Sequence, residues 1–197
     1  MALINGLTYS PDNIVENGLL VLRSSNIQNE QISFEDNVYV NLNVEDEYLT
    51  CENDILICVR NGSKRLIGKS LLISRNLPKS THGAFMTVFR GDSNKFISHW
   101  LKTPMFIKEV HKNLGATINS INGSNLKKFK TFFPNSKEEQ EKIASFLTSV
   151  DTKIEQKTKK EQLLQQYKKG VMQKIFNQEI RFKADDGSEF CDWEEKK

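Results

Sequence analysis

The stretch that decides the architecture is Ser136–Phe176, SKEEQEKIASFLTSVDTKIEQKTKKEQLLQQYKKGVMQKIF, which contains no proline and one glycine, Gly170. Ser136 and Glu139 fit a capping box, in which a serine and a glutamate three residues later satisfy free N–H groups at the start of a helix. We therefore predict one helix over residues 136–176, about 60 Å long at 1.5 Å per residue. A small globular domain does not need so long a helix, so we expect it to pack on another long helix or to act as a spacer.

A 3.5-residue repeat runs through this predicted helix, and seven of its ten positions are apolar. This pattern is typical of the seam of a coiled coil. The apolar seam positions are Ile143, Leu147, Val150, Ile154, Leu164, Val171 and Ile175. Lys157, Glu161 and Lys168 occupy the other three and make the middle of the seam polar. We predict that the seven apolar residues pack against a partner helix.

Residues 1–135 read as short strands and turns. Gly18–Arg23 and Asp54–Val59 are brief apolar runs bounded by polar residues or glycine, as buried strands are. Asn61-Gly62 is a strong signal for a tight turn and predicts an exposed loop immediately after it. A helical pattern over residues 95–112 is broken or kinked at Pro104. We predict an α+β protein: a globular mixed-strand domain over 1–135, the long helix over 136–176, and a polar segment over 177–197 that is a linker or a strand borrowed by a globular domain.

The charges are unevenly distributed, although 28 basic and 25 acidic residues give a net charge of only +3. Eight acids and no Lys or Arg lie between Ser24 and Val59. The next stretch reverses this, with seven cations and no acid: Arg60, Lys64, Arg65, Lys69, Arg75, Lys79 and Arg90. If the fold gathers these cations on one side, a polyanion such as DNA would bind there through phosphate neutralisation. Alternatively, they form solvated strand faces that pair with the acidic block.

Several classes of protein are disfavoured by the sequence. No apolar run approaches the roughly 18 residues of a membrane span, and no basic and apolar signal segment opens the chain. Three scattered cysteines predict a reduced, cytoplasmic setting. We find no spacing for a metal site, no glycine loop for a phosphate or S-adenosylmethionine, and no nuclease-type carboxylate–lysine set, while a Cys–His pair stays open. We predict a non-catalytic binding and scaffolding protein without metal, cofactor or membrane contact.

Three segments carry a resemblance to a known family: Phe133–Leu147, Asp151–Ile154 and Lys168–Phe176. They resemble the conserved helical region of the specificity (S) subunits of type I restriction–modification systems, in which a proline-led EQ-x-x-IA-x-x-L run opens a long helix. Gly18–Ile27 and Asn53–Leu56 look like parts of the target-recognition domain of that family, which often has Gly-Asp-Ile-Leu at the latter position.

A full S subunit of this family has two recognition domains, each followed by a helix, and the two helices pack antiparallel. This chain has one of each, so it resembles half a subunit, and its last residues, 181–197, look like the opening of a recognition domain. The chain would then be a fragment or a permuted half whose end completes the fold of 1–135. The resemblance implies double-stranded DNA, methyltransferase (M) subunits and restriction (R) subunits as partners, a homodimer through the long helix, and catalysis in the partner subunits.

The resemblance also implies that loops of the recognition domain enter the major groove, where each base pair shows a distinct pattern of donors and acceptors. Arg60 or Arg65 would suit guanine, and Asn26 or Asn61 would suit adenine. The predicted contacts to bases or phosphates are Thr8, Tyr9, Arg23, Ser24, Ser25, Asn26, Arg60, Asn61, Ser63, Lys64, Arg65, Lys79, Thr81, His82, Thr117 and Asn119. The rival hypotheses are a coiled-coil adaptor without DNA specificity and a small stand-alone nuclease.

Overall fold

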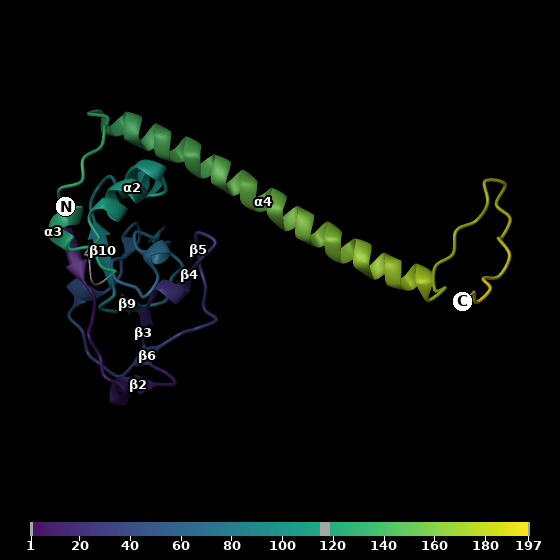
Figure 1. The fold of residues 1–197 in the computed structure, drawn as a ribbon, viewed down its shortest axis with the longest axis horizontal. Helices are drawn as coiled ribbons and strands as arrows, with labels where there is room; N and C mark the ends of the chain where they lie inside the picture. Colours follow the sequence, from purple (N-terminus) through teal and green to yellow (C-terminus); the bar gives the residue numbers. More distant parts are fainter. Residues whose placement is uncertain (1, 115–118, 197) are drawn as a thin grey trace. The chain divides into compact units, whose positions relative to one another are not determined.

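The computed structural model of the chain describes residues 2–114 and 119–196. It confirms the predicted class, mixed strands followed by a long helix (Figure 1). The chain divides into two compact units, Met1–Leu147 and Thr148–Lys197. No helix among the described residues combines the length and the apolar character needed to cross a bilayer.

The first sheet has four antiparallel strands in the order β1-β10-β7-β8. These strands are β1 (Ala2–Asn5), β7 (Ile55–Cys58), β8 (Ser70–Leu72) and β10 (Met86–Arg90). In the register of the sheet, Val88 lies between Ile4 and Leu56. All four residues of β7 are buried, because β7 is a central strand. The apolar run predicted as a buried strand is therefore the middle of the fold.

The second sheet has the order β2-β6-β3-β9 and contains one parallel pair, β3 with β9. Its strands are β2 (Ile14–Val15), β3 (Leu19–Leu22), β6 (Tyr39–Val40) and β9 (Ser80–His82), and a separate hairpin is formed by β4 (Ile27–Gln28) and β5 (Gln31–Ile32). The hairpin turns through Asn29 and Glu30, both with positive φ, of 49° and 61°. Positive φ at both central residues is the geometry of a tight two-residue turn. Short 3-10 turns occupy Pro11–Asn13, Ser24–Asn26, Asp46–Tyr48 and Lys64–Leu66.

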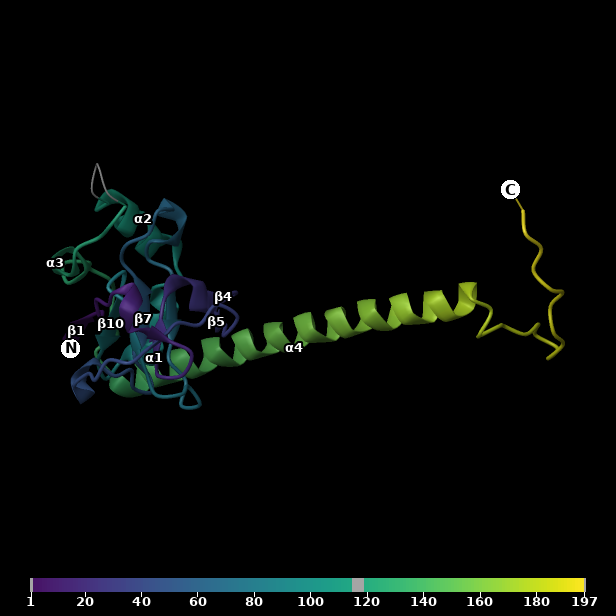
Figure 2. The ribbon, with the colours of Figure 1, turned by 90° about the horizontal axis from the view of Figure 1, so that it is seen from below.

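Four α-helices follow the strands: α1 (Asn94–Trp100), α2 (Pro104–Lys112), α3 (Gly123–Leu126) and α4 (Lys137–Phe176). Pro104 separates α1 from α2 by opening the second helix, where its missing N–H costs nothing. The prediction for α4 is confirmed: it is one 40-residue helix (Figure 2), and the Glu139 N–H donates to Ser136 Oγ at 3.3 Å. Phe106 and Val110 of α2 join the buried core of the first sheet.

A buried ion pair fastens the first sheet at the start of β7. Asp54, 1% exposed, accepts hydrogen bonds from Arg90 Nη2 at 2.7 Å and Nε at 2.9 Å, and from the Cys51 N–H at 2.8 Å. Arg90 Nη2 also donates to the Leu49 carbonyl at 2.7 Å. The carboxylate raises the pKa of the Arg90 guanidinium, so Arg90 stays charged. It joins the start of β7, the end of β10 and the preceding acidic loop.

The segment after α4 is held by contacts within itself. Arg181 Nη1 donates to Asp192 Oδ1 at 2.8 Å, and its Nη2 donates to the Phe190 carbonyl at 3.0 Å. Lys183 and Glu189 form an isolated antiparallel bridge. Phe182 and Phe190 are nevertheless exposed. The interpretation of residues 177–197 as a linker or as part of a recognition domain stays a prediction.

The two Asp–Arg pairs of the first unit allow a matched test of stability. We expect Asp54→Ala to lower the free energy of unfolding by about 3 kcal/mol, because it leaves the partly buried Arg90 without its counter-ion. Asp36 forms a 2.7 Å pair with Arg23 but is itself exposed, so Asp36→Ala should cost less than about 1 kcal/mol. Urea unfolding followed by fluorescence measures both. Equal losses would contradict the structural role of the buried pair.

Candidate nucleic-acid interface

The parallel pairing of β3 with β9 places the loops that follow these two strands side by side, at the C-terminal ends of both strands. Both strands run in the same direction, so Arg23–Asn26, after β3, lies beside Gly83–Phe85, after β9. Leu7 joins them, because its N–H donates to the His82 carbonyl at 2.7 Å and it bridges to Gly83. A Cβ on Gly6 would lie 2.0 Å from the Gly83 carbonyl oxygen, so this close approach requires glycine.

The segment after β7 reaches the same place from the first sheet. The N–H groups of Val59 and Arg60 both donate to the Phe85 carbonyl, at 2.9 and 3.1 Å. Asn61 Nδ2 donates to Ser24 Oγ at 3.0 Å, and Asn119 Nδ2 donates to the Gly62 carbonyl at 2.8 Å. Hydrogen bonds therefore join five segments, which we call the loop end: residues 7–9, 23–26, 59–65, 83–85 and 119–121.

The seven cations between Arg60 and Arg90 do not share one face. Because β7 is antiparallel to both β8 and β10, the segment that follows β7 and the residues that follow β8 and β10 lie at opposite ends of the sheet. The loop after β7, which leads into β8, carries Arg60, Lys64, Arg65 and Lys69. The other end carries Arg75, Lys79 and Arg90. The single positive face considered from sequence is thus divided, and Arg90 is bound to Asp54.

Arg60 is oriented by an aromatic ring that the sequence did not single out. Its guanidinium carbon lies 5.7 Å from the centroid of the Phe85 ring, within the range of a cation–π contact. Phe85 is 55% exposed, because it lies in the turn between β9 and β10. The available signal was an aromatic residue directly after Gly83-Ala84, at a turn between two strands.

Three predicted DNA contacts, Asn26, Thr81 and His82, have side chains that are buried and hydrogen-bonded inside the domain. Asn26 accepts from the Arg23 N–H at 2.9 Å and donates to the Ser33 carbonyl at 3.0 Å. Thr81 Oγ1 donates to the Tyr48 carbonyl at 2.9 Å. Asn26, Thr81 and His82 are each at most 1% exposed. Their polar atoms shape the loops from inside instead of facing a ligand.

His82 shows how this internal bonding works. Its Nε2 lies 3.0 Å from the Ile4 carbonyl oxygen, so Nε2 carries the proton and donates. Burial lowers the pKa of His82, which keeps the ring neutral at physiological pH. Among the described residues Nδ1 finds no hydrogen-bond partner. The ring therefore connects β9 to β1 and adds no positive charge for DNA.

The remaining predicted contacts differ in position. Lys79 precedes β9 and lies at the opposite end of that strand from the loop end. Arg23 is partly exposed and paired with Asp36. Thr117 falls outside the described residues. The structure brings the other predicted residues together at the loop end: Thr8, Tyr9, Ser24, Ser25, Arg60, Asn61, Ser63, Lys64, Arg65 and Asn119.

The Cys–His pair that the sequence left open can be judged at Cys58. Cys58 is buried, and burial raises the pKa of its thiol to about 11, so it is not a thiolate nucleophile at neutral pH. No group of three or more His, Cys, Asp or Glu side chains in the described ranges could hold a metal ion. The loop end offers hydrogen-bond donors, cationic side chains and one aromatic ring, which are groups that bind a ligand.

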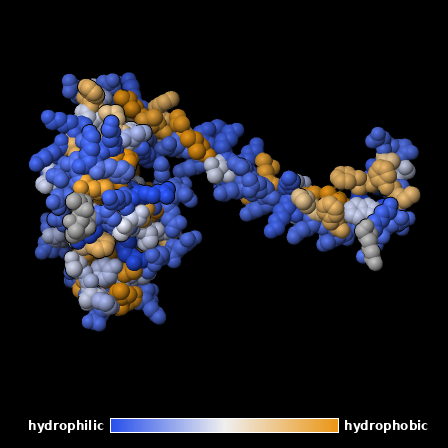
Figure 3. Space-filling view, in the orientation of Figure 1, coloured by the Kyte–Doolittle hydropathy of each residue, from blue (hydrophilic) through white to orange (hydrophobic). Residues whose placement is uncertain are grey.

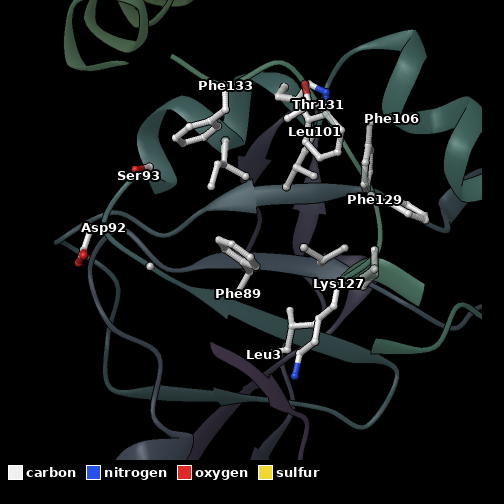
Figure 4. A pocket seen from close by; sticks show the side chains of 15 residues that line it. Leu3, Phe89, Asp92, Ser93, Leu101, Phe106, Lys127, Phe129, Thr131 and Phe133 are labelled. Atoms are coloured by element: carbon white, nitrogen blue, oxygen red, sulfur yellow. The ribbon is translucent and has the colours of Figure 1, made fainter. Parts of the chain in front are cut away.

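A separate pocket of about 380 Å³ is mainly apolar. Leu3, Phe89, Phe106, Phe129 and Phe133 line it (Figure 4). Lys127, Asp92 and Ser93 supply its few polar groups. Such walls suit an apolar side chain better than a phosphate or a base edge, so we do not assign this pocket to DNA.

Three of the seven apolar seam residues of α4 are exposed, and the other four are half-buried. Val150, Ile154 and Leu164 have exposed fractions of 40%, 58% and 55%. The other four, Ile143, Leu147, Val171 and Ile175, are half-buried. Figure 3 shows apolar side chains at the surface of α4 between polar ones. A helix face of this kind is typical of a surface that binds another helix.

The chain is similar in sequence to the specificity subunits of type I restriction enzymes. A family model described as type I restriction modification DNA specificity domain matches residues 2–166. The type I restriction enzyme EcoKI specificity subunit of Escherichia coli (strain K12) is 28% identical over 183 residues, 86% of this chain and 39% of the relative. The StySPI specificity subunit of Salmonella potsdam is 27% identical over the same shares. The chain thus spans about two fifths of the length of these curated relatives.

A solved structure supports the fold. It is described as the structural basis of complex assembly and conformational transition of the type I R-M system. The likeness has a TM-score of 0.61 at 16% identity and covers 88% of this chain and 43% of that chain. At this identity the likeness supports the fold alone. Because the family model covers most of the sequence, the chain belongs to the family of type I restriction modification DNA specificity domains.

Proposed function

We propose that the chain is the sequence-specific DNA recognition part of a type I restriction–modification complex. It reads one half of a bipartite target and directs methyltransferase and restriction subunits to it, without catalysing either reaction itself. Residues 1–135 would bind DNA, 136–176 would pair and space two copies, and 177–197 would link or complete a recognition domain. A DNA target of this kind implies a cytoplasmic location.

The observation that carries the proposal is the convergence of five segments at the loop end. Its hydrogen bonds fix the loop backbone, while Arg60, Lys64 and Arg65 remain exposed. Fixed loops place donors at defined positions, as base readout requires. Arg60, oriented over Phe85, and Arg65 are candidates for guanine, whereas Lys64 suits a phosphate. An adaptor without DNA specificity would not need this arrangement.

Salt-dependent DNA binding tests the role of the loop end. The full chain is titrated with a random-sequence duplex, which suits a protein whose motif is unknown. Replacing both Lys64 and Arg65 with Ala should weaken binding and reduce the slope of log K against log salt by roughly 2, since on random-sequence DNA both cations would contact phosphates and each such contact contributes about 0.9. The matched control replaces Arg75 and Lys79, two cations at the opposite end, and should leave the slope unchanged. Equal effects would contradict a localised interface.

Methylation mapping tests the complete function. We expect cells that express this chain with a cognate methyltransferase subunit to methylate a two-part motif with symmetric halves, because two copies of one recognition domain would act together. Long-read sequencing measures the modified adenines. Absence of methylation despite co-purification of the two subunits would contradict recognition by paired copies.

Pairing through α4 is tested by charged substitutions in its seam. Replacing Leu147 and Ile154 together with Glu should convert the dimer to monomers, because four carboxylates would have to be buried between the helices. Light scattering gives the mass, and circular dichroism checks that the fold is kept. Gln156→Glu with Gln166→Glu adds the same charge outside the seam and should leave the dimer intact.

A further inference from the structure

We propose that another pocket of the first unit, beside the loop end, binds one backbone phosphate of the DNA through the ammonium group of Lys69 and the hydroxyl groups of Ser24 and Ser25. This inference rests on the proposed function, and Lys69 is not among the contacts predicted from the sequence. The pocket has a volume of about 460 Å³. One wall comes from residues 24–29, and the other comes from Leu66 and Lys69.

The backbone of Lys69 has a rigid support at the end of β7. The Gly68 N–H donates to the Cys58 carbonyl, and the Cys58 N–H donates to the Lys69 carbonyl, both at 2.8 Å. Gly68 has φ +85°, and a Cβ there would lie 3.1 Å from Cγ2 of Val110, so this turn requires glycine. Because its backbone is fixed in this way, Lys69 lines the pocket from a defined position.

The positive charge of Lys69 has no counter-ion within the described ranges. No acidic residue lines the pocket. Glu30, which follows the first wall, is paired with Lys102 at 2.6 Å, and Asp36 is paired with Arg23 at 2.7 Å. Lys69 is half-buried, so solvent screens its charge less than it screens that of an exposed lysine. A cation in this setting favours an anionic ligand.

Two serine hydroxyl groups of the opposite wall can still form hydrogen bonds. Ser24 Oγ accepts from Asn61 Nδ2 at 3.0 Å, so its own hydrogen remains available to an acceptor. Ser25 Oγ is buried and finds no hydrogen-bond partner among the residues that the structure describes. A buried hydroxyl group without a partner costs free energy. A ligand with several oxygen atoms would accept from both serines.

These groups suit a phosphate better than a base edge. The ammonium group of a lysine is a point charge on a flexible stem, which binds phosphates without the planar geometry that base readout uses. Serine hydroxyl groups are common donors to phosphate oxygens. The pocket also adjoins the loop end, because Ser24 and Ser25 belong to both and Leu66 directly follows Arg65. A duplex whose bases meet the loop end would present its backbone beside the pocket.

Neutralising Lys69 in the full chain tests the phosphate contact. On the random-sequence duplex, Lys69→Gln should reduce the slope of log K against log salt by roughly 1, since one phosphate contact contributes about 0.9. Lys69→Arg keeps the charge and should keep the slope. The matched control, Lys79→Gln, removes a cation at the opposite end of the domain and should also leave the slope unchanged. A parent-like slope for Lys69→Gln would overturn the proposal.

Removing the unpaired hydroxyl group gives an independent readout. Ser25→Ala changes no charge, so it should leave the salt slope unchanged but weaken duplex binding at fixed salt by about fivefold, because a hydrogen bond to a charged group is lost. Ser74→Ala removes an exposed hydroxyl group far from the pocket in sequence and should bind like the parent chain. Circular dichroism checks that both variants fold. If Ser25→Ala binds as tightly as the parent, the two-sided pocket is wrong.

Inorganic phosphate distinguishes DNA from a free anion as the source of the phosphate group. The midpoint of thermal unfolding is measured with and without phosphate for the parent chain and for Lys69→Gln. Stabilisation of the parent alone, with equal salt slopes for DNA in both chains, would show a site for free phosphate and overturn the assignment to DNA. A parent chain that does not bind the duplex overturns the proposed function itself, whereas a chain that responds to changes at Lys64 and Arg65 but not at Lys69 overturns only this pocket.

Discussion

The ion pair between Asp54 and Arg90 is the interaction on which the fold of the first unit, Met1–Leu147, depends. It closes one end of β7 by joining the start of that strand to the end of β10. Asn53, just before it, has φ +66°, a conformation that favours Gly or Asn. The ion pair fixes the N-terminal end of β7. The four buried residues of the strand then position Arg60 and the following loop at its C-terminal end.

Polar residues of the loops fall into two groups with different tasks. Asn26, Thr81 and His82 are buried and satisfy backbone carbonyl groups of neighbouring segments. Arg60, Lys64 and Arg65 are exposed, and the guanidinium group of Arg60 lies over the ring of Phe85. A change in the first group would alter the shape of the loops, whereas a change in the second would alter what the loops contact. The exposed side chains can therefore be replaced without breaking the hydrogen bonds that shape the loops.

Local sequence signals predicted the elements better than the site. The cap at Ser136 and the unbroken run of helix-forming residues identified α4, and apolar runs identified β3 and β7, because these features depend on neighbours in sequence. The parallel pairing of β3 with β9 joins residues about sixty positions apart, and no local pattern encodes it. That pairing contributes to the burial of Thr81 and His82, and the antiparallel pairing of β7 with β10, with Met86 opposite Cys58, brings Phe85 beside Arg60. Both pairings depend on the tertiary fold, so these placements could not be predicted.

The two ends of β7 differ in charge, which gives the first unit an electric dipole. The segment that follows β7 carries Arg60, Lys64, Arg65 and Lys69, whereas at the opposite end the five acids of residues 45–54 outnumber the cations Arg75, Lys79 and Arg90. In the field of a polyanion such a body experiences a torque before any contact forms. The basic end is turned toward the phosphates and the acidic end is repelled. Encounters in the wrong orientation would thus be rejected at a distance, which shortens the search for a productive complex.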